Sequence, residues 1–341
     1  MPSKYQIRAD DKVLADLTHE EYVYYNGKLK TGINIAGSLS FSLMPNNPVV
    51  SSLMPLKSTI TLRRNGKTIW SGRIIQTKKN IYNQYDITCE GALSWLYDIM
   101  IPPTSFKNTT VGDIVSSIIG SYNSLCSANR LFVVGEIEDE NIITLSQKED
   151  YISVFDILKE IVSINGGYFI VTYQENGTPI LNYYNSGLDT PNEIRFGENL
   201  LDINEYIDTT KIITSLYAVG DGVELTSPKY IENENAVESY GRVFGFARFD
   251  DISDQAELIT QATNYLNQNI LGDISIKVKA IAINWDANAG YNVRVISKHN
   301  GIDVNMIISE VVTDLNNEAS GYITIGSSQK TLTKKLALEG K

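Results

Sequence analysis

The sequence predicts a β-rich α+β protein, with short strands on both sides of a small module that contains helices. Segments such as Ser38–Leu43 alternate serine with apolar residues, which is the pattern of a half-buried strand. Turn residues separate many of these segments. Apolar residues at helical spacing occur near residues 111–122, 154–164 and 254–271. Strands therefore outnumber helices in the expected fold.

The N-terminal part, residues 1–103, is predicted to be a sheet domain. Thr59–Arg64 and Lys67–Ile75 flank the pair Asn65-Gly66. This pair supplies the two positive φ angles that a type I′ hairpin turn requires. Tyr85–Cys89 is expected to continue the same sheet.

Residues 104–203 are predicted to form the small α+β module, because helical spacing begins after a pair of prolines. Thr109 or Thr110 is the expected cap of the first helix, and Ser153 is the expected cap of the second. The second helix is expected to stop at Asn165-Gly166-Gly167, where glycine accepts the left-handed conformation.

Strands return in residues 204–329, which we predict to be a second β-rich domain with a helical insertion near residues 252–271. Several short strands separated by turns favour a barrel or a sandwich. Residues 330–341 are expected to be a C-terminal tail.

Charge and hydropathy exclude several classes of function. The net charge is −11, from 29 basic and 40 acidic residues, whereas a nucleic-acid-binding surface needs a basic stripe. No segment has the roughly 18 consecutive apolar residues of a membrane-spanning helix. The N-terminus lacks the apolar run of a signal peptide. We therefore expect neither DNA binding nor direct membrane insertion.

The sequence offers no convincing catalytic or metal site. His19 and His299 lie in different β-rich regions, and zinc sites need clustered ligands. Cys89 and Cys126 lack the adjacent imidazole that would activate a thiol. Other isolated signals are interpreted as a turn, Gly220-Asp221-Gly222, and as helix-capping residues, Asp250, Asp251 and Asp254. No catalytic, cofactor-binding or metal-binding residue is assigned.

The 20 tyrosines leave two interpretations open. Tyrosine suits protein interfaces and carbohydrate-binding surfaces, because its ring buries area while its hydroxyl keeps a hydrogen bond. Tyrosine also has a high propensity for strands, which accounts for many of these residues without any binding role.

Short motifs occur in a characteristic order along almost the whole chain. They are Gly37–Leu43, Pro45-Asn46-Asn47-Pro48, Arg64-Asn65-Gly66-Lys67, Trp70-Ser71-Gly72-Arg73, Thr88-Cys89-Glu90-Gly91, Asp98, Gly166-Gly167-Tyr168, Phe196–Asp202, Tyr240-Gly241-Arg242, Phe249–Ile252, Asn292–Val295 and Ile325-Gly326. In this order they resemble the N-terminal hub region of tail-associated lysins, also described as phage minor structural proteins or prophage tail endopeptidases.

The resemblance implies a baseplate-hub fold with two β-barrels per chain, and a homotrimeric ring that presents six similar barrels. Such a ring would join a sixfold tail tube to a threefold tip. The implied partners are the distal tail protein, the tail tube or tape-measure protein, and tip or fibre proteins. DNA would pass through without specific binding. The implied location is the virion tail tip, after synthesis in the cytoplasm of the host bacterium.

The expected role is structural and not enzymatic. Longer members of the resembling family continue into a peptidase or cell-wall hydrolase domain, whereas this sequence ends at Lys341, soon after the last predicted strands. We therefore expect no lysin domain, no cofactor and no metal. The alternatives are a carbohydrate-binding phage tail or receptor-binding protein, and a cell-wall enzyme that uses a pair of carboxylates.

Overall fold

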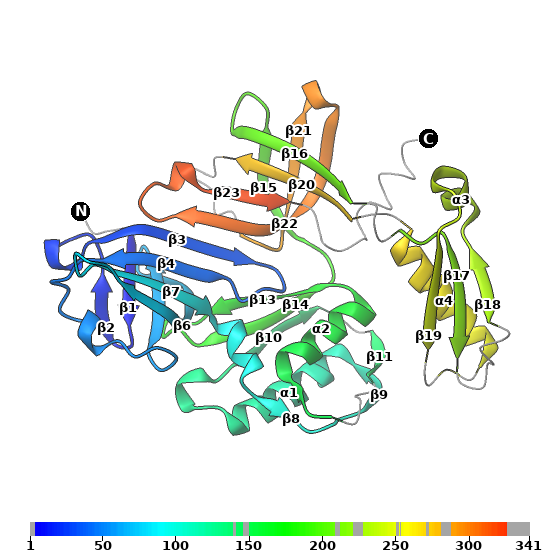
Figure 1. Cartoon of the computed structure of the whole chain (residues 1–341), viewed down its shortest axis with the longest axis horizontal. Helices are drawn as coiled ribbons and strands as arrows, with labels where there is room; N and C mark the ends of the chain where they lie inside the picture. The colour runs from blue at the N-terminus through cyan, green and yellow to red at the C-terminus, as the bar shows by residue number, and fades with distance from the viewer. Residues whose placement is uncertain are drawn as a thin grey trace. The chain divides into compact units, whose positions relative to one another are not determined.

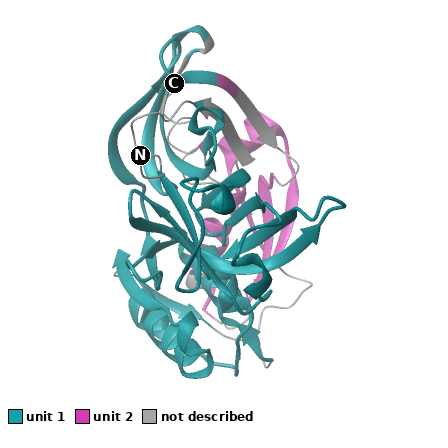
Figure 2. Ribbon diagram, turned by 90° about the vertical axis from the view of Figure 1, so that its left-hand side faces the viewer, with its two compact units in different colours: residues 1–201, 279–324 teal, residues 202–278, 325–341 magenta. Residues whose placement is uncertain are grey.

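The computed structural model describes residues 4–138, 141–145, 150–208, 212–220, 228–249, 252, 254–270, 273–280 and 288–325. The chain forms two compact units (Figure 2). The first contains residues 1–201 and 279–324, and the second contains residues 202–278 and 325–341. Strands dominate the described elements, so the β-rich fold class is confirmed. The domain boundaries expected from the sequence stay a prediction.

A long sheet runs through the first unit (Figure 1). Its strands are β1 (Tyr5–Ala9), β2 (Lys12–Ala15), β3 (Tyr24–Gly32), β4 (Ser38–Leu43), β5 (Thr59–Arg64), β6 (Lys67–Lys79), β7 (Tyr85–Gly91), β15 (Leu188–Arg195), β21 (Tyr291–Ser297), β22 (Ile302–Asp314) and β23 (Tyr322–Ile325). The order is β23-β22-β3-β4-β7-β6-β5-β1-β2, and β21 pairs with β22 and β15. Among the described strands this path does not return to its start, so no closed barrel is found there.

The hairpin predicted at Asn65-Gly66 is confirmed. Asn65 has a φ of 51° and Gly66 a φ of 83°, and Arg64 pairs with Lys67 across the turn. The second strand is longer than predicted, because β6 continues to Lys79. Its last residues are polar and exposed, so no apolar alternation marks them, but they still pair with the start of β7.

Trp70 in β6 is covered almost completely, and its indole lies against two glycines. Gly72 and Gly91 are partners on the adjacent strands β6 and β7. A Cβ added at Gly72 would lie 2.4 Å from Trp70 Cη2 and 2.1 Å from the carbonyl oxygen of Glu90. One added at Gly91 would lie 3.1 Å from Trp70 Nε1. The missing side chains therefore provide the space for the ring.

Arg73 follows this glycine in β6 and joins two acidic residues. Its Nε donates to Glu90 Oε1 at 2.7 Å, and its Nη2 donates to Asp98 Oδ1 at 3.0 Å. Burial by itself would lower the pKa of Arg73, but the hydrogen bonds with Asp98 and Glu90 outweigh burial and raise that pKa. This network fixes the segment after β7, because Asp98 also accepts from Arg130 at 3.2 Å.

The module with helices follows in the same unit. It contains a 3-10 helix (Ala92–Tyr97), β8 (Met100–Ile101), β9 (Phe106–Thr110), α1 (Val111–Leu125), β10 (Val133–Glu138), β11 (Ile142–Leu145), β12 (Ile152–Ser153), α2 (Val154–Asn165), β13 (Tyr168–Tyr173) and β14 (Pro179–Tyr184). The expected caps are confirmed: Thr110 and Ser153 each accept from the backbone N–H three residues later, at 3.2 and 3.1 Å. The apolar faces of α1 and α2 share one core.

The second unit contains β16 (Leu200–Asp208), β17 (Ser215–Gly220), β18 (Lys229–Glu232), α3 (Glu234–Tyr240), β19 (Phe244–Phe249), α4 (Gln255–Asn269) and β20 (Asp273–Ala280). The central strand β17 is antiparallel to β18 and parallel to β19. Leu258, Ala262 and Leu266 of α4 pack with Leu216 and Ala218 of β17, so the predicted helix is confirmed.

The expected start of α4 is found at Asp254. Asp254 Oδ1 accepts the backbone N–H of Ala256 at 3.0 Å, as expected of a residue at a helix start. Several residues named in the sequence analysis lie outside the described residues: Asp221, Gly222, Asp250, Asp251 and the tail 330–341. The sequence did not predict α3, because this helix has seven residues and buries only Ala236, so it has no apolar periodicity.

We predict that Gly72→Ala destabilises the protein more than Gly66→Ala does. A Cβ at Gly72 meets a backbone carbonyl and the Trp70 ring, so we expect a loss of about 3 kcal/mol or more in the free energy of unfolding. A Cβ at Gly66 meets nothing within 4 Å, so only its left-handed φ costs about 1 kcal/mol. Denaturant unfolding measures both, and equal losses would contradict the packing of Trp70 on Gly72.

We also predict that Glu318→Gln makes stability less dependent on acid pH. The Glu318 carboxylate accepts from Lys4 and Tyr5 and lies 3.9 Å from Arg64. Its burial alone would raise the pKa, but the bonds with Lys4 and Tyr5 and the nearby positive charges lower it below the ordinary 4.5. The folded state therefore binds this proton less readily than the unfolded state, and its stabilising contribution is lost as the pH falls through the folded pKa.

The measurement is the difference in unfolding free energy between wild type and Glu318→Gln, at neutral pH and well below pH 4.5. We expect a clear advantage of the wild type at neutral pH that shrinks in acid. A difference that does not change with pH would show that the carboxylate charge contributes nothing.

Candidate functional site

The residues considered for catalysis in the sequence do not form a site. His19 lies beside Thr18 and Tyr22, whereas the ring of His299 stacks on Phe196 at 6.2 Å. Burial raises the pKa of the Cys89 and Cys126 thiols, which disfavours the reactive thiolate. Within the described ranges, no group of three or more His, Cys, Asp or Glu side chains could hold a metal ion.

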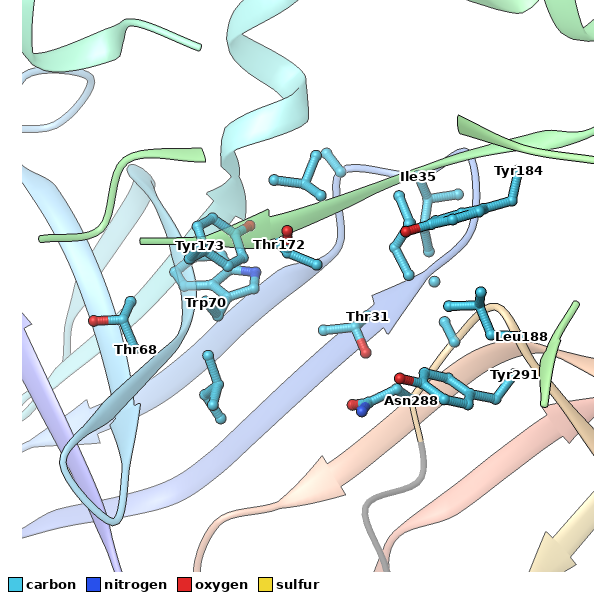
Figure 3. A pocket seen from close by; sticks show the side chains of 16 residues that line it. Thr31, Ile35, Thr68, Trp70, Thr172, Tyr173, Tyr184, Leu188, Asn288 and Tyr291 are labelled. Atoms are coloured by element: carbon cyan, nitrogen blue, oxygen red, sulfur yellow. The ribbon is translucent and has the colours of Figure 1, made fainter. Parts of the chain in front are cut away.

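A cavity of about 360 Å³ lies within the first unit (Figure 3). Its walls come from the end of β3 and the β3–β4 connection, from β6, from β13 and β14, from the first residues of β15 and β21, and from the segment just before β21. The lining residues are Thr31, Gly32, Ile35, Ala36, Thr68, Ile69, Trp70, Ile170, Val171, Thr172, Tyr173, Tyr184, Leu188, Asn288, Ala289 and Tyr291.

Backbone contacts fix the walls of this cavity relative to one another. Asn34, in a left-handed turn after β3, donates its N–H to the Phe169 carbonyl at 2.9 Å and accepts the Phe169 N–H on Oδ1 at 2.7 Å. At the other end, the Glu175 carbonyl accepts from Arg63 at 3.0 Å and from Thr68 at 2.8 Å. The sheet and the module are thereby joined on both sides of the cavity.

Aromatic residues stand at both ends of the cavity. Trp70 and Tyr173 lie at one end, and Tyr184 and Tyr291 lie on opposite sides of the other end (Figure 3). The Tyr173 hydroxyl donates to the Ser71 carbonyl at 3.3 Å. The Tyr184 hydroxyl donates to Glu136 at 3.1 Å, and burial together with this bond raises the pKa of Tyr184 to about 12. Both rings therefore stay neutral and fixed.

The cavity lining holds no charged side chain among the described residues. Its polar groups are hydroxyls, an amide and the indole N–H of Trp70, which is buried and has no hydrogen-bond partner in the described part of the chain. Such a lining has no nucleophile paired with a base. Uncharged hydrogen-bonding groups beside aromatic rings are suited to binding an uncharged molecule.

The sequence did not reveal this cavity, because its lining residues are spread from Thr31 to Tyr291 and share no motif. Two features of the sequence are related to the cavity. Trp70 belongs to one of the family motifs, and the abundance of tyrosine suggested a protein interface or a carbohydrate-binding surface. Neither signal indicated which residues come together in space.

The tip of the β6–β7 hairpin carries two large exposed apolar residues. Ile81 is 89% and Tyr82 is 81% exposed. The turn is well ordered, since Asn80 Oδ1 accepts the backbone N–H groups of Tyr82 and Gln84, both at 3.0 Å. A rigid turn that presents apolar side chains to solvent is typical of a contact point with another protein.

An aromatic face covers one side of the small sheet in the second unit. The rings of Tyr217 and Phe244 stack with centroids 5.6 Å apart, and Tyr230 lies 5.5 Å from Tyr217. Phe246 is also exposed, on the strand position that pairs with Tyr217. The opposite face of the sheet packs on α4. This aromatic face is a further apolar surface open to solvent.

The described helices include none with the length and apolarity to cross a bilayer.

Comparison with known proteins identifies the kind of protein that the chain resembles. Residues 188–336 match the family model described as prophage endopeptidase tail. This segment covers less than half of the chain. No curated protein matches the sequence.

Solved structures that resemble the chain include tail proteins. The prophage tail protein gp18 of Listeria monocytogenes EGD-e has a TM-score of 0.62 and 16% identity, over 99% of this chain and 98% of that protein. A tail protein of Neisseria meningitidis MC58 has a TM-score of 0.66 and 14% identity, over 95% and 96%. The E. coli c3393 protein has a TM-score of 0.52 and 12% identity, over 89% and 73%.

The c3393 protein is a component of a type VI secretion system, described as structurally similar to the T4 bacteriophage tail proteins gp27 and gp5. The resemblance predicted from the sequence motifs is therefore confirmed: residues 188–336 match the prophage tail family model, and the whole chain has the fold of prophage tail proteins.

Proposed function

We propose that this chain is a structural protein of a phage or prophage tail and acts as the hub at the tail tip. The likeness to the Listeria prophage tail protein, which spans almost the full length of both chains, carries this proposal. The match of residues 188–336 to the prophage tail family supports it by sequence, independently of the fold. The similarity of c3393 to T4 tail proteins favours a hub within the tail.

The hub is proposed to be a homotrimeric ring. Each chain would contribute two barrel-like domains, residues 1–103 and 204–329, joined by the module of residues 104–203. Three chains would then present six similar surfaces, which is what a sixfold tail tube requires of a threefold tip. The ring would contact the distal tail protein and tail tube or tape-measure protein on one side, and tip or fibre proteins on the other.

The exposed apolar surfaces are suited to such assembly. The tip residues Ile81 and Tyr82 and the aromatic face around Tyr217 are open to solvent in the single chain. Interface cores are enriched in aromatic residues, and burying these surfaces would add stability in proportion to their apolar area. We propose that the β6–β7 tip contacts a neighbouring protomer of the ring.

The proposed role is not enzymatic, although the family description contains the word endopeptidase. The neutral cavity lining and the raised thiol pKa values of Cys89 and Cys126 favour this assignment. The net charge of −11 supports passage of DNA through the ring without specific binding, because like charges repel.

We predict that the purified protein, or the protein mixed with its distal tail partner, forms a species of three times the 38.0 kDa chain mass. Light scattering after gel filtration, over a range of concentrations, measures this mass. A stable dimer in both samples would contradict the threefold ring, since a closed threefold assembly has no dimeric end state.

We predict that the double variant Ile81→Ser, Tyr82→Ser weakens this assembly and leaves the folded chain intact. Both side chains are almost fully exposed, so their loss should change the free energy of unfolding by no more than about 0.5 kcal/mol. The trimer should require a higher protein concentration, because apolar contact area is lost.

Leu125→Ser is the matched control, since Leu125 is a 60% exposed apolar residue at the end of α1 and not part of the hairpin tip. An unchanged trimer in the double variant, with the same concentration dependence as the control, would remove the β6–β7 tip from the protomer contact.

A further inference from the structure

Three polar groups of the cavity lining lie at the end of the cavity opposite Trp70. The Thr31 hydroxyl, the Tyr291 hydroxyl and the Asn288 amide lie near one another (Figure 3). None of the three side chains makes a hydrogen bond to another described residue. Polar groups at a cavity wall that are not paired within the protein are available to water or to a ligand.

The same cavity offers aromatic rings beside these polar groups. Tyr291 and Tyr184 face the end where the hydroxyls and the amide converge, and Trp70 with Tyr173 lies at the far end (Figure 3). The Tyr184 ring is held by its bond to Glu136 and by Tyr168, whose centroid is 5.9 Å away. Fixed rings next to free hydrogen-bonding groups suit a ligand with both apolar C–H faces and hydroxyls.

The charge of the lining and the volume of the cavity limit the class of ligand further. The lining has no charged side chain among the described residues, so it offers no counter-ion to a phosphate, a carboxylate or an ammonium group. Burying such an ion without a partner would be strongly unfavourable. The volume of about 360 Å³ lies within the range of small-molecule sites, roughly 300–1,000 Å³.

We propose that this cavity binds one or two units of a neutral saccharide. The hydroxyls of Thr31 and Tyr291 and the amide of Asn288 would exchange hydrogen bonds with sugar hydroxyls. The C–H face of the sugar ring would lie on Tyr184 or Tyr291, which replaces water on apolar surface. This inference rests on the cavity alone, and it goes beyond the proposed hub role without depending on it.

Saturation-transfer NMR and calorimetry with free sugars test the proposal. The neutral probes are glucose, galactose, rhamnose and N-acetylglucosamine with their disaccharides, and the charged probes are glucuronic acid and glucosamine. We expect at least one neutral sugar to bind saturably at millimolar concentration or below, and the charged sugars to bind more weakly. Equal binding of charged and neutral sugars, or no binding of any probe, would overturn the proposal.

Two conservative variants locate the site. Thr31→Val and Tyr291→Phe keep the shape of each side chain and remove one hydroxyl, so each should weaken binding by about 3- to 10-fold. Tyr217→Phe removes a hydroxyl from the second unit and should leave binding unchanged. Circular dichroism checks that each variant is folded. If all three folded variants bind the sugar equally well, the ligand binds elsewhere and the proposal is wrong.

Discussion

The packing of Trp70 on two glycines is the contact on which the surrounding structure depends. Gly72 and Gly91 face each other on β6 and β7, and the indole fills the space that their missing side chains leave. This contact fixes the register of the two strands and places Arg73 directly beside Glu90. Arg73 in turn holds Asp98, where the module with helices begins. The buried Trp70 ring thus packs within the sheet, and the buried Arg73 beside it connects the sheet to the module.

The cavity follows from the same arrangement. The module meets the sheet at two sets of hydrogen bonds, Asn34 with Phe169 at one end and the Glu175 carbonyl with Arg63 and Thr68 at the other. Between these ends the cavity is lined by aliphatic side chains, aromatic rings and short polar groups. The cavity thus lies between hydrogen-bonded contacts on both sides, and its described lining carries no charged side chain.

Local features of this fold could be predicted from the sequence because each depends on neighbouring residues. Examples are the Asn65-Gly66 turn, the Thr110 and Ser153 caps, and the helix at Gln255–Asn269. Features that depend on distant residues could not be predicted. The parallel pairing of β15 with β21 joins segments about a hundred residues apart, and the cavity combines Thr31 with Tyr291. The family motifs marked Trp70, Gly72 and Gly91 without giving the reason, which is their mutual packing.

The apolar side chains of this chain fall into two groups: those exposed on the surface, and those that line the cavity. The apolar groups at the hairpin tip and on the aromatic face of the second unit are exposed, and they stand on rigid turns or strands. In the cavity, Trp70 and Tyr184 are buried, and the hydroxyls of Tyr173 and Tyr184 make hydrogen bonds of their own. Exposed apolar surface is unfavourable in an isolated chain and becomes favourable only when another protein covers it. A covered neutral cavity has no such need for a partner protein, so a small ligand could occupy it in the free chain and in an assembled tail alike.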